Sequence, residues 1–187
     1  MTPVRAVGPR VSYADLQQAP EDGRRYELYD GEVFVVPAPM PRHQLAVQNL
    51  VDRLRSYQHS HGGLVLASPI DIVFSEFDVV QPDVVFFIRE RADLVDPDRA
   101  IRDAPDLAVE VLSPSTAATD RGNKMRMLAR YGVPEYWLVD PLARTLEIYG
   151  LSAGAYALEQ IASDDDIARS RILSELAFPG REIFGDW

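Results

Sequence analysis

Two short apolar segments, each interrupted by a carboxylate, constrain the fold of this chain more than any other feature. Residues 79–88 read Val-Val-Gln-Pro-Asp-Val-Val-Phe-Phe-Ile, and residues 106–112 read Asp-Leu-Ala-Val-Glu-Val-Leu. Runs of this length, rich in β-branched and aromatic residues, predict strands that protein covers on both faces. The chain should therefore build a buried sheet that carries Asp83 and Glu110.

Carboxylates in such a sheet need partners. An unpaired charge is costly to bury, so a buried acid binds a metal ion or a cationic side chain, or it takes up a proton. We therefore expect one of these partners beside Asp83 and beside Glu110.

The only lysine of the chain, Lys124, is a candidate for that cation, because the other basic residues among the 19 are arginines. A lysine ammonium is compact and its pKa moves readily, which an arginine cannot offer. The pattern from Asp120 to Tyr131 predicts a helix that stops at Gly132, with Pro134 just beyond.

At helical spacing Lys124 shares a face with Met127, Leu128 and Tyr131, which places it on or beside the buried stripe. An alternative is that Asp120 and Lys124 form an exposed i, i+4 ion pair, which would contribute only about 0.3–0.5 kcal/mol to stability. The position of the helix against the sheet distinguishes a functional lysine from a surface lysine.

Two carboxylates and an ammonium that converge from neighbouring elements suit a hard divalent cation. Oxygen ligands and retained waters favour Mg²⁺ or Mn²⁺ over zinc, and the chain has no cysteine thiolate to offer zinc. Beside a metal-bound water, Lys124 would position the nucleophile or offset negative charge in the transition state.

Two further ionisable residues lie nearer the N-terminus. Glu27 lies on the first arm of a predicted hairpin that turns at Asp30-Gly31, where an exposed edge-strand carboxylate explains it as well as a site residue does. His43 opens a predicted helix from about Pro41 to His59 and lies in line with its apolar stripe. His43 either contacts a phosphate or is a packed, hydrogen-bonded side chain, and the second interpretation is favoured.

Other chemistries lack their motifs. No Gly-x-Ser-x-Gly elbow surrounds Ser113 or Ser115, and no phosphate-binding P-loop, Gly-x-Gly-x-x-Gly fingerprint or zinc-ligand spacing occurs in the chain.

In order and spacing, these segments resemble the Uma family of restriction-endonuclease-like proteins, a branch of the PD-(D/E)XK nuclease superfamily. The resemblance runs from Val11 to Phe184. It rests on residues 21–32, His43-Gln44, Gln81-Pro82-Asp83, residues 110–115, residues 120–124 and residues 132–141.

The resemblance implies an α/β (α+β) fold: a restriction-endonuclease-like core with a mixed central β-sheet flanked by helices, and an N-terminal β-hairpin extension. It implies an Mg²⁺-dependent endonuclease that hydrolyses phosphodiester bonds of DNA. The catalytic residues it implies are Asp83, Glu110, Lys124 and Glu27. The metal site it implies comprises Asp83, Glu110 and Val111, and its candidates for substrate contact are His43, Arg121 and Tyr131.

One position departs from the superfamily pattern. That pattern has a lysine two residues after the second acid, where this chain has Leu112. The family arrangement instead supplies a lysine from the following helix, and Lys124 is the only lysine available. If the helix does not direct Lys124 at the acids, the nuclease interpretation fails.

Composition predicts one domain of residues 11–187 after a loose leader of residues 1–10. A chain of 187 residues with 47% hydrophobic content can bury one good core, and no linker divides it. No apolar run approaches the roughly 20 residues that span a bilayer, and the N-terminus lacks a signal pattern. We expect a cytoplasmic protein without a membrane partner, and the absence of cysteine agrees with that compartment.

The net charge of −10 is the main objection to a nucleic-acid partner, because phosphate binding normally draws on clustered basic residues. Part of the deficit is local, since a bound cation neutralises acids at the site and the Lys124 helix carries Arg121, Arg126 and Arg130. A homodimer that pairs two such helices would assemble a basic groove.

Two functions therefore stay open. The first is a metal-dependent endonuclease acting on DNA. The second is a non-catalytic interaction or scaffold protein that keeps the nuclease fold, in which Lys124 only neutralises Asp83 and Glu110 in a buried charge cluster.

Overall fold

The computed structural model describes residues 9–19 and 22–185. Its strands are β1 Arg25–Tyr29, β2 Glu32–Val36, β3 Leu64–Ala67, β4 Ile72–Ser75, β5 Asp78–Val80, β6 Val84–Phe87, β7 Leu107–Val111, β8 Glu135–Asp140, β9 Thr145–Ser152, β10 Ala155–Ala162, β11 Ile167–Arg169 and β12 Ala177–Pro179. Its helices are α1 Tyr13–Gln17, α2 Pro41–His61, the 3₁₀ helix η1 Arg89–Leu94, α3 Ala117–Thr119, the π-helical turn η2 Asp120–Lys124, α4 Met125–Arg130 and α5 Arg181–Phe184.

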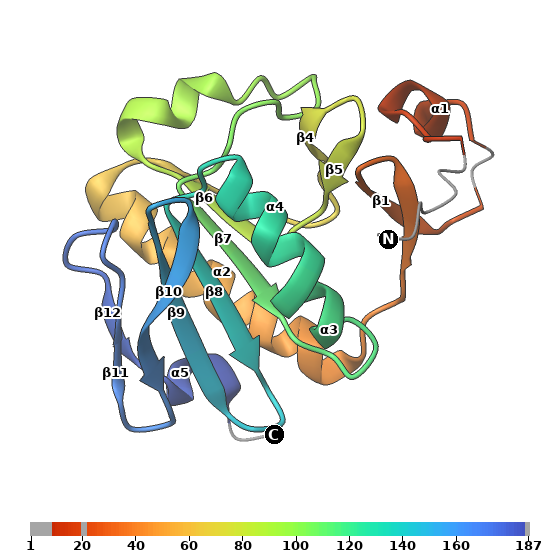
Figure 1. Ribbon diagram of the computed structural model, residues 1–187. Coiled ribbons are helices and arrows are strands. Elements are labelled where there is room, and N and C mark those ends of the chain that lie inside the picture. The colour runs from red at the N-terminus through yellow and green to blue at the C-terminus, as the bar shows by residue number, and fades with distance from the viewer. Residues whose placement is uncertain (1–8, 20–21, 186–187) are drawn as a thin grey trace.

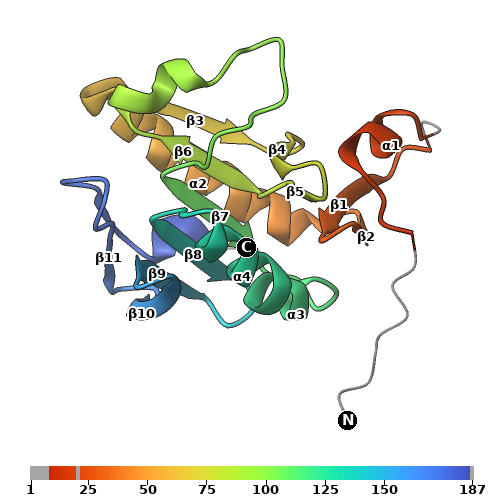
Figure 2. The same ribbon diagram turned by 45° about the horizontal axis from the view of Figure 1, so that its top comes forward.

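The centre of the molecule is a mixed six-stranded sheet in the order β10-β9-β8-β7-β6-β3. Strands β7 and β8 are parallel, and the other neighbours are antiparallel. Helices cover both faces, with α2 on one side and α4 on the other (Figures 1 and 2). A second sheet, in the order β2-β1-β5-β4, carries the N-terminal hairpin beside this core. The α+β fold with a mixed central sheet between helices is therefore confirmed.

The alternation of side chains along β7 explains how an acid reaches one face of the core. Val109 and Val111 pack in the apolar cluster that includes α2, whereas Ala108 packs in the cluster that includes Leu128 of α4. Because successive side chains of a strand point to opposite faces, Glu110 lies on the same face as Ala108, under α4. All five residues of β7 are buried, as its composition predicts.

Residues 79–88 do not form the single strand that their composition predicts. The segment breaks at Gln81-Pro82-Asp83, so β5 pairs in the second sheet and β6 pairs in the central sheet. Pro82 has no N–H to donate to a ladder, and proline is excluded from strand interiors for that reason. Asp83 consequently lies in the connection between two sheets.

Residues 64–75 likewise form two strands in different sheets, separated by a proline. The chain leaves β3 at Ala67, turns through Ser68-Pro69 and re-enters a strand at Ile72 in the other sheet. By contrast, the hairpin at Asp30-Gly31 is confirmed, with positive φ at both turn residues.

Both predicted helices are present, but their boundaries differ from the predicted ones. The helix from Pro41 extends two residues further, to His61. The helix carrying Lys124 begins at Ala117 rather than at Asp120, and it contains the π turn η2 that the sequence pattern does not reveal. The short elements β11, β12 and α5 were not predicted either.

Part of the predicted N-terminal leader, residues 1–8, lies outside the described residues. At its end, Arg10 donates to Asp30 at the hairpin turn and lies over the ring of Phe77. Within residues 9–19 and 22–185, no helix combines the length and the apolar character needed to cross a membrane.

Candidate active site

A hollow of about 200 Å³ collects the predicted site residues. It lies between the β1–β2 hairpin, the beginning of α2, the chain after β7 and the helical segment from α3 to η2. Its lining includes four carboxylates and one ammonium, from Glu27, Asp83, Glu110, Asp120 and Lys124.

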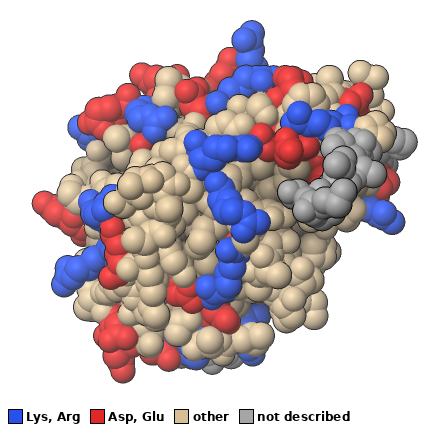
Figure 3. All heavy atoms as spheres, viewed as in Figure 1, with Lys and Arg blue, Asp and Glu red and all other residues tan. Residues whose placement is uncertain are grey.

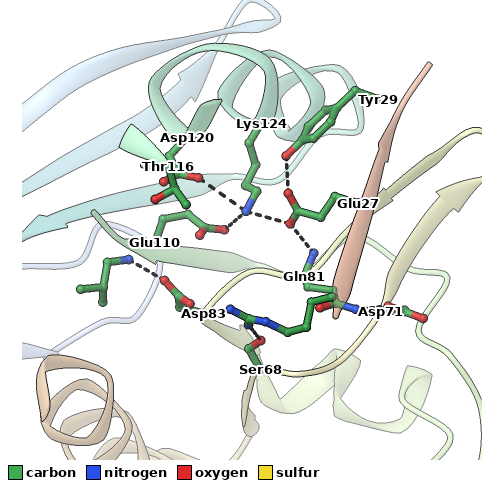
Figure 4. Close-up of polar contacts among 12 residues, drawn as sticks. Glu27, Tyr29, Ser68, Asp71, Gln81, Asp83, Glu110, Thr116, Asp120 and Lys124 are labelled. Atoms are coloured by element: carbon green, nitrogen blue, oxygen red, sulfur yellow. Dashed lines mark hydrogen bonds and ion pairs between the residues drawn. The ribbon is translucent and has the colours of Figure 1, made fainter. Parts of the chain in front are cut away.

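Lys124 is the centre of this arrangement (Figure 4). Its Nζ lies 2.8 Å from Glu110 Oε1 and 2.9 Å from Glu27 Oε1. Asp120 Oδ1 lies 3.6 Å from the same Nζ. Only 4% of the Lys124 side chain is exposed, so the alternative of an exposed Asp120–Lys124 surface pair is wrong.

Glu27 is an inward-facing acid, and the alternative of an exposed edge-strand carboxylate is also wrong. Its residue exposure is 3%. Besides Lys124, its Oε1 accepts the main-chain N–H of Gln81 at 2.8 Å, and its Oε2 accepts the Tyr29 hydroxyl at 2.7 Å. These two donors hold the Glu27 carboxylate towards the ammonium.

Asp83 approaches from the opposite side of the hollow. The main-chain N–H of Val111 donates to Asp83 Oδ2 at 2.8 Å, and His43 Nε2 lies 3.1 Å from the same oxygen. These contacts link the β5–β6 connection to the end of β7 and to the first turn of α2. The break at Pro82 thus allows Asp83 to reach the end of β7 beside Glu110.

Asp120 and Lys124 lie four residues apart at the two ends of the π turn η2 and face the same acids. Both residues are buried although the flanking Arg121 is exposed. Isolated π turns carry an extra residue within a helix and occur frequently at functional sites. In this chain the turn directs an acid and an ammonium together towards Glu110.

Burial and the charge of the ion-pair partner act in opposite directions on the pKa of each of these groups. Burial raises the pKa of Glu110 well above its ordinary value, although the Lys124 ammonium counteracts this. Burial likewise raises the pKa of Asp120. For Lys124, burial alone would lower the pKa, but Glu110 and Glu27 outweigh it and raise the pKa above the ordinary value. The neighbouring acids therefore favour the protonated, cationic form of Lys124.

The donor set fits a hard divalent cation in its chemistry. Asp83 and Glu110 present carboxylate oxygens to one hollow whose acids outnumber its ammonium, and Mg²⁺ typically takes one or two carboxylates while it retains waters. Within residues 9–19 and 22–185, no group of three or more His, Cys, Asp or Glu side chains is arranged to hold a metal ion.

The structure brings His43 to the hollow but places two other candidates elsewhere. Arg121 donates to both carboxylate oxygens of Glu147, at 2.6 and 2.7 Å, on the surface. The Tyr131 hydroxyl donates to Asp78 Oδ2 at 2.8 Å, and neither Arg121 nor Tyr131 lines the hollow. Their predicted contact with substrate thus has no support from position.

Several residues in or next to the hollow were not predicted from the sequence. Asp120 and Tyr29 contact site acids or the ammonium, and Arg25 lines the hollow while it donates to Ser68 Oγ at 2.7 Å. The spacing of Asp120 four residues before Lys124 was visible in the sequence. For Arg25 and Tyr29, only the alternation along the predicted strand with Glu27 offered a signal.

The mixed sheet between helices, with an acidic hollow around one ammonium, defines a restriction-endonuclease-like α+β protein. A crystal structure described as "a putative nuclease belonging to DUF820 from Anabaena variabilis" has this fold, with a TM-score of 0.78 and 20% identity over 93% of this chain and 97% of that one. The family model Uma2, described as "Putative restriction endonuclease", matches residues 13–181. The chain belongs to the Uma2 family, which confirms the resemblance found in the sequence. Comparison with curated proteins gives no match.

Proposed function

We propose that this protein is a metal-dependent nuclease that hydrolyses phosphodiester bonds of DNA, with Mg²⁺ as its cofactor and Mn²⁺ as a substitute. The observation that carries the proposal is the contact of the single lysine with Glu110 and Glu27 in a hollow that also holds Asp83. The family description and the nuclease neighbour support the same reaction class.

The roles of the residues follow from their geometry. Asp83 and Glu110 would hold the metal ion, with Val111 fixing the Asp83 carboxylate through its main-chain N–H. A bound divalent cation would polarise the phosphate and lower the pKa of a bound water. Glu27 orients the ammonium of Lys124, because its own oxygens are held by Gln81 and Tyr29.

Lys124 acts as a cation in this proposal and not as a base. Its raised pKa keeps the ammonium protonated, so it cannot accept the proton of the attacking water. It can donate a hydrogen bond to a phosphate oxygen and offset the negative charge that develops there, which is most effective in a water-poor site. Burial raises the pKa of Glu110, and without a metal ion its carboxylate is paired with the Lys124 ammonium.

The test is cleavage of labelled DNA in Mg²⁺ and in Mn²⁺ by the wild type and by variants of the site. Asp83→Asn, Glu110→Gln and Lys124→Ala should each reduce the cleavage rate by at least about a hundredfold, the usual effect of removing an electrostatic catalytic group. Glu135→Gln is the matched control. Glu135 is also a buried acid, but it contacts Trp137 and the main chain at Arg171 outside the hollow, so its variant should retain cleavage.

The scaffold function has one observation in its favour, namely that Lys124 is already neutralised by Glu110 and Glu27. Lys124→Arg distinguishes the two functions. Because arginine keeps the charge in a different shape, a scaffold should tolerate it, whereas a nuclease site should lose cleavage. A wild type without cleavage in either metal, together with a lowered melting temperature for Lys124→Ala, would favour the scaffold.

A further inference from the structure

The site lies at the bottom of a narrow hollow. The exposed fractions of the side chains are 4% for Lys124, 6% for Glu110 and 10% for Asp83. The volume of about 200 Å³ is below the roughly 300–1,000 Å³ of pockets that enclose a drug-sized molecule. A substrate phosphate must therefore enter the hollow to reach these groups.

Two chain segments form the walls of the hollow. Part of the lining is formed by residues 37–40, Pro-Ala-Pro-Met, which follow the hairpin and end in the 72% exposed Met40. Another part is formed by the segment 113–116 after β7, with the hydroxyls of two serines and a threonine. One wall is apolar and the other is hydrogen-bonding, which suits a base on one side and a sugar-phosphate on the other.

Two neighbouring hollows share residues with this one. An open hollow beneath Arg126 and Arg130 of α4 shares Phe34. A smaller hollow on the other side, lined by Gln44 and Ser68, shares Arg25 and His43. The three hollows thus adjoin one another, with an aromatic ring at one junction and a guanidinium at the other. Single strands of nucleic acid bind to such surfaces, because their bases stack on aromatic rings while cationic side chains contact their phosphates.

The side-chain charges near these three hollows are suited to binding only a few phosphates. On the face seen in Figure 3, a band of basic side chains crosses the region of α4 and acidic side chains flank it. Within that region Arg130 is paired with Asp78, and Arg121 is paired with Glu147. A duplex surface carries one negative charge per about 1.7 Å, so a chain with a net charge of −10 is poorly suited to it.

From this geometry we infer that the site takes an unpaired strand of nucleic acid, as a single strand or a frayed end, and excludes the intact duplex. This inference rests on the proposed nuclease function. The strand passes between residues 37–40 and 113–116, and it presents one phosphate to Lys124 and the two carboxylates at a time. Pairing with a complementary strand would prevent this entry.

The experiment compares a fluorescein-labelled DNA oligonucleotide as a single strand and as a blunt duplex with its complement. Cleavage is followed in Mn²⁺, and binding is followed by anisotropy in EDTA. We expect the single strand to be cleaved at least about tenfold faster, and bound at least about tenfold more tightly, than the duplex. The slope of log affinity against log salt should be about −2, as expected for roughly three phosphates on a single strand.

A pair of variants tests the route of entry. Ala38→Trp places a large ring on an exposed position of the apolar wall, so it should abolish cleavage and single-strand binding without lowering the melting temperature. Leu94→Trp is the matched control, since Leu94 is 46% exposed and lies in η1, beyond the end of β6 opposite Asp83. This control should behave as the wild type does.

The outcomes separate this inference from the proposed function. Duplex cleavage as fast as single-strand cleavage overturns the inference and leaves the nuclease function standing. Single-strand binding that Ala38→Trp abolishes, without any cleavage, supports the inference and overturns the nuclease function. The absence of both cleavage and strand preference overturns both.

Discussion

At the level of single residues, the site depends on one ammonium that several acids share. Glu110, Glu27 and Asp120 surround Lys124 at 2.8, 2.9 and 3.6 Å. Removing one partner of a buried ion pair typically costs about 3–5 kcal/mol, because the remaining charge stays buried. Removing Lys124 should therefore also destabilise the fold, because buried acids would lose their cationic partner.

The identity of the site residues was only partly predictable. The sequence indicated Asp83, Glu110 and Lys124, because acids within apolar runs and a lone lysine are visible without a structure. The burial of Glu27 was not predictable, since it depends on Tyr29, Gln81 and Lys124, which lie on three different elements. The distant position of Tyr131 was also hidden, because its helical face is shared with Lys124 but its hydroxyl binds Asp78.

The raised pKa of Glu110 predicts how stability depends on pH. A carboxyl whose pKa is higher in the folded chain binds more protons when folded. The free energy of unfolding of the metal-free protein should therefore fall as the pH rises from about 4.5, the ordinary value for glutamate, towards the raised folded-state pKa. The contribution of Glu110 to the free energy of unfolding is greatest at pH values below this range.

Denaturant unfolding across this pH range in EDTA, for the wild type and for Glu110→Gln, measures this contribution. The comparison is needed because other carboxylates, such as Glu147 beside Arg121, have lowered pKa values and oppose the trend. The stability of Glu110→Gln relative to the wild type should rise with pH. A difference that stays constant or falls with pH would be inconsistent with a raised pKa for Glu110.

At the scale of elements, the breaks in regular structure position the site. The interruption at Gln81-Pro82-Asp83 moves Asp83 to the end of β7, and the π turn η2 directs Asp120 and Lys124 inwards. The first break could have been predicted from the proline alone. The π turn could not, because the sequence from Asp120 to Tyr131 fits an uninterrupted α-helix equally well.

Deletion of Gly122 tests the π turn. Without the extra residue the segment should become a regular α-helix in which the faces before and after the turn stay aligned, while Asp120 and Lys124 stand three residues apart instead of four. Asp120 would then leave its place 3.6 Å from the Lys124 ammonium. We expect cleavage to be lost while circular dichroism still reports a folded protein.

The control for this deletion is Gly122→Ala. A Cβ at this position would meet only the far end of the Arg126 side chain, at 3.9 Å. Alanine should therefore be tolerated and should stabilise the helix by about 0.5–1 kcal/mol. Retained cleavage in the deletion variant would show that the π turn does not position the site.

In the whole molecule, the sequence predicted the individual elements better than it predicted which strands form the second sheet. The hairpin, α2, β7 and the strands from Glu135 onwards agree with the apolar patterns. The separation of β4 and β5 from β3 and β6 was missed, because local composition does not tell which sheet a strand joins. The elements β11, β12 and α5 are too short to give a periodic signal.

The net charge of −10 makes the assembly state relevant to nucleic-acid binding. We propose that two copies pair so that their α4 helices, each with Arg126 and Arg130 exposed, line a common basic groove. Sedimentation velocity should then report a dimer. The double variant Arg126→Glu, Arg130→Glu should weaken DNA binding without dissociating the dimer. A monomeric profile at working concentrations would rule out this groove.

The most direct test of the central claim is calorimetric titration of Mn²⁺ into the wild type, Asp83→Asn and Glu110→Gln, because it requires no knowledge of the substrate. If Asp83 and Glu110 hold the metal, the wild type should bind Mn²⁺ saturably at one site, and each variant should bind at least about tenfold more weakly. Equal binding by all three proteins, or no saturable binding by the wild type, would contradict the assignment of this hollow as a metal-dependent nuclease site.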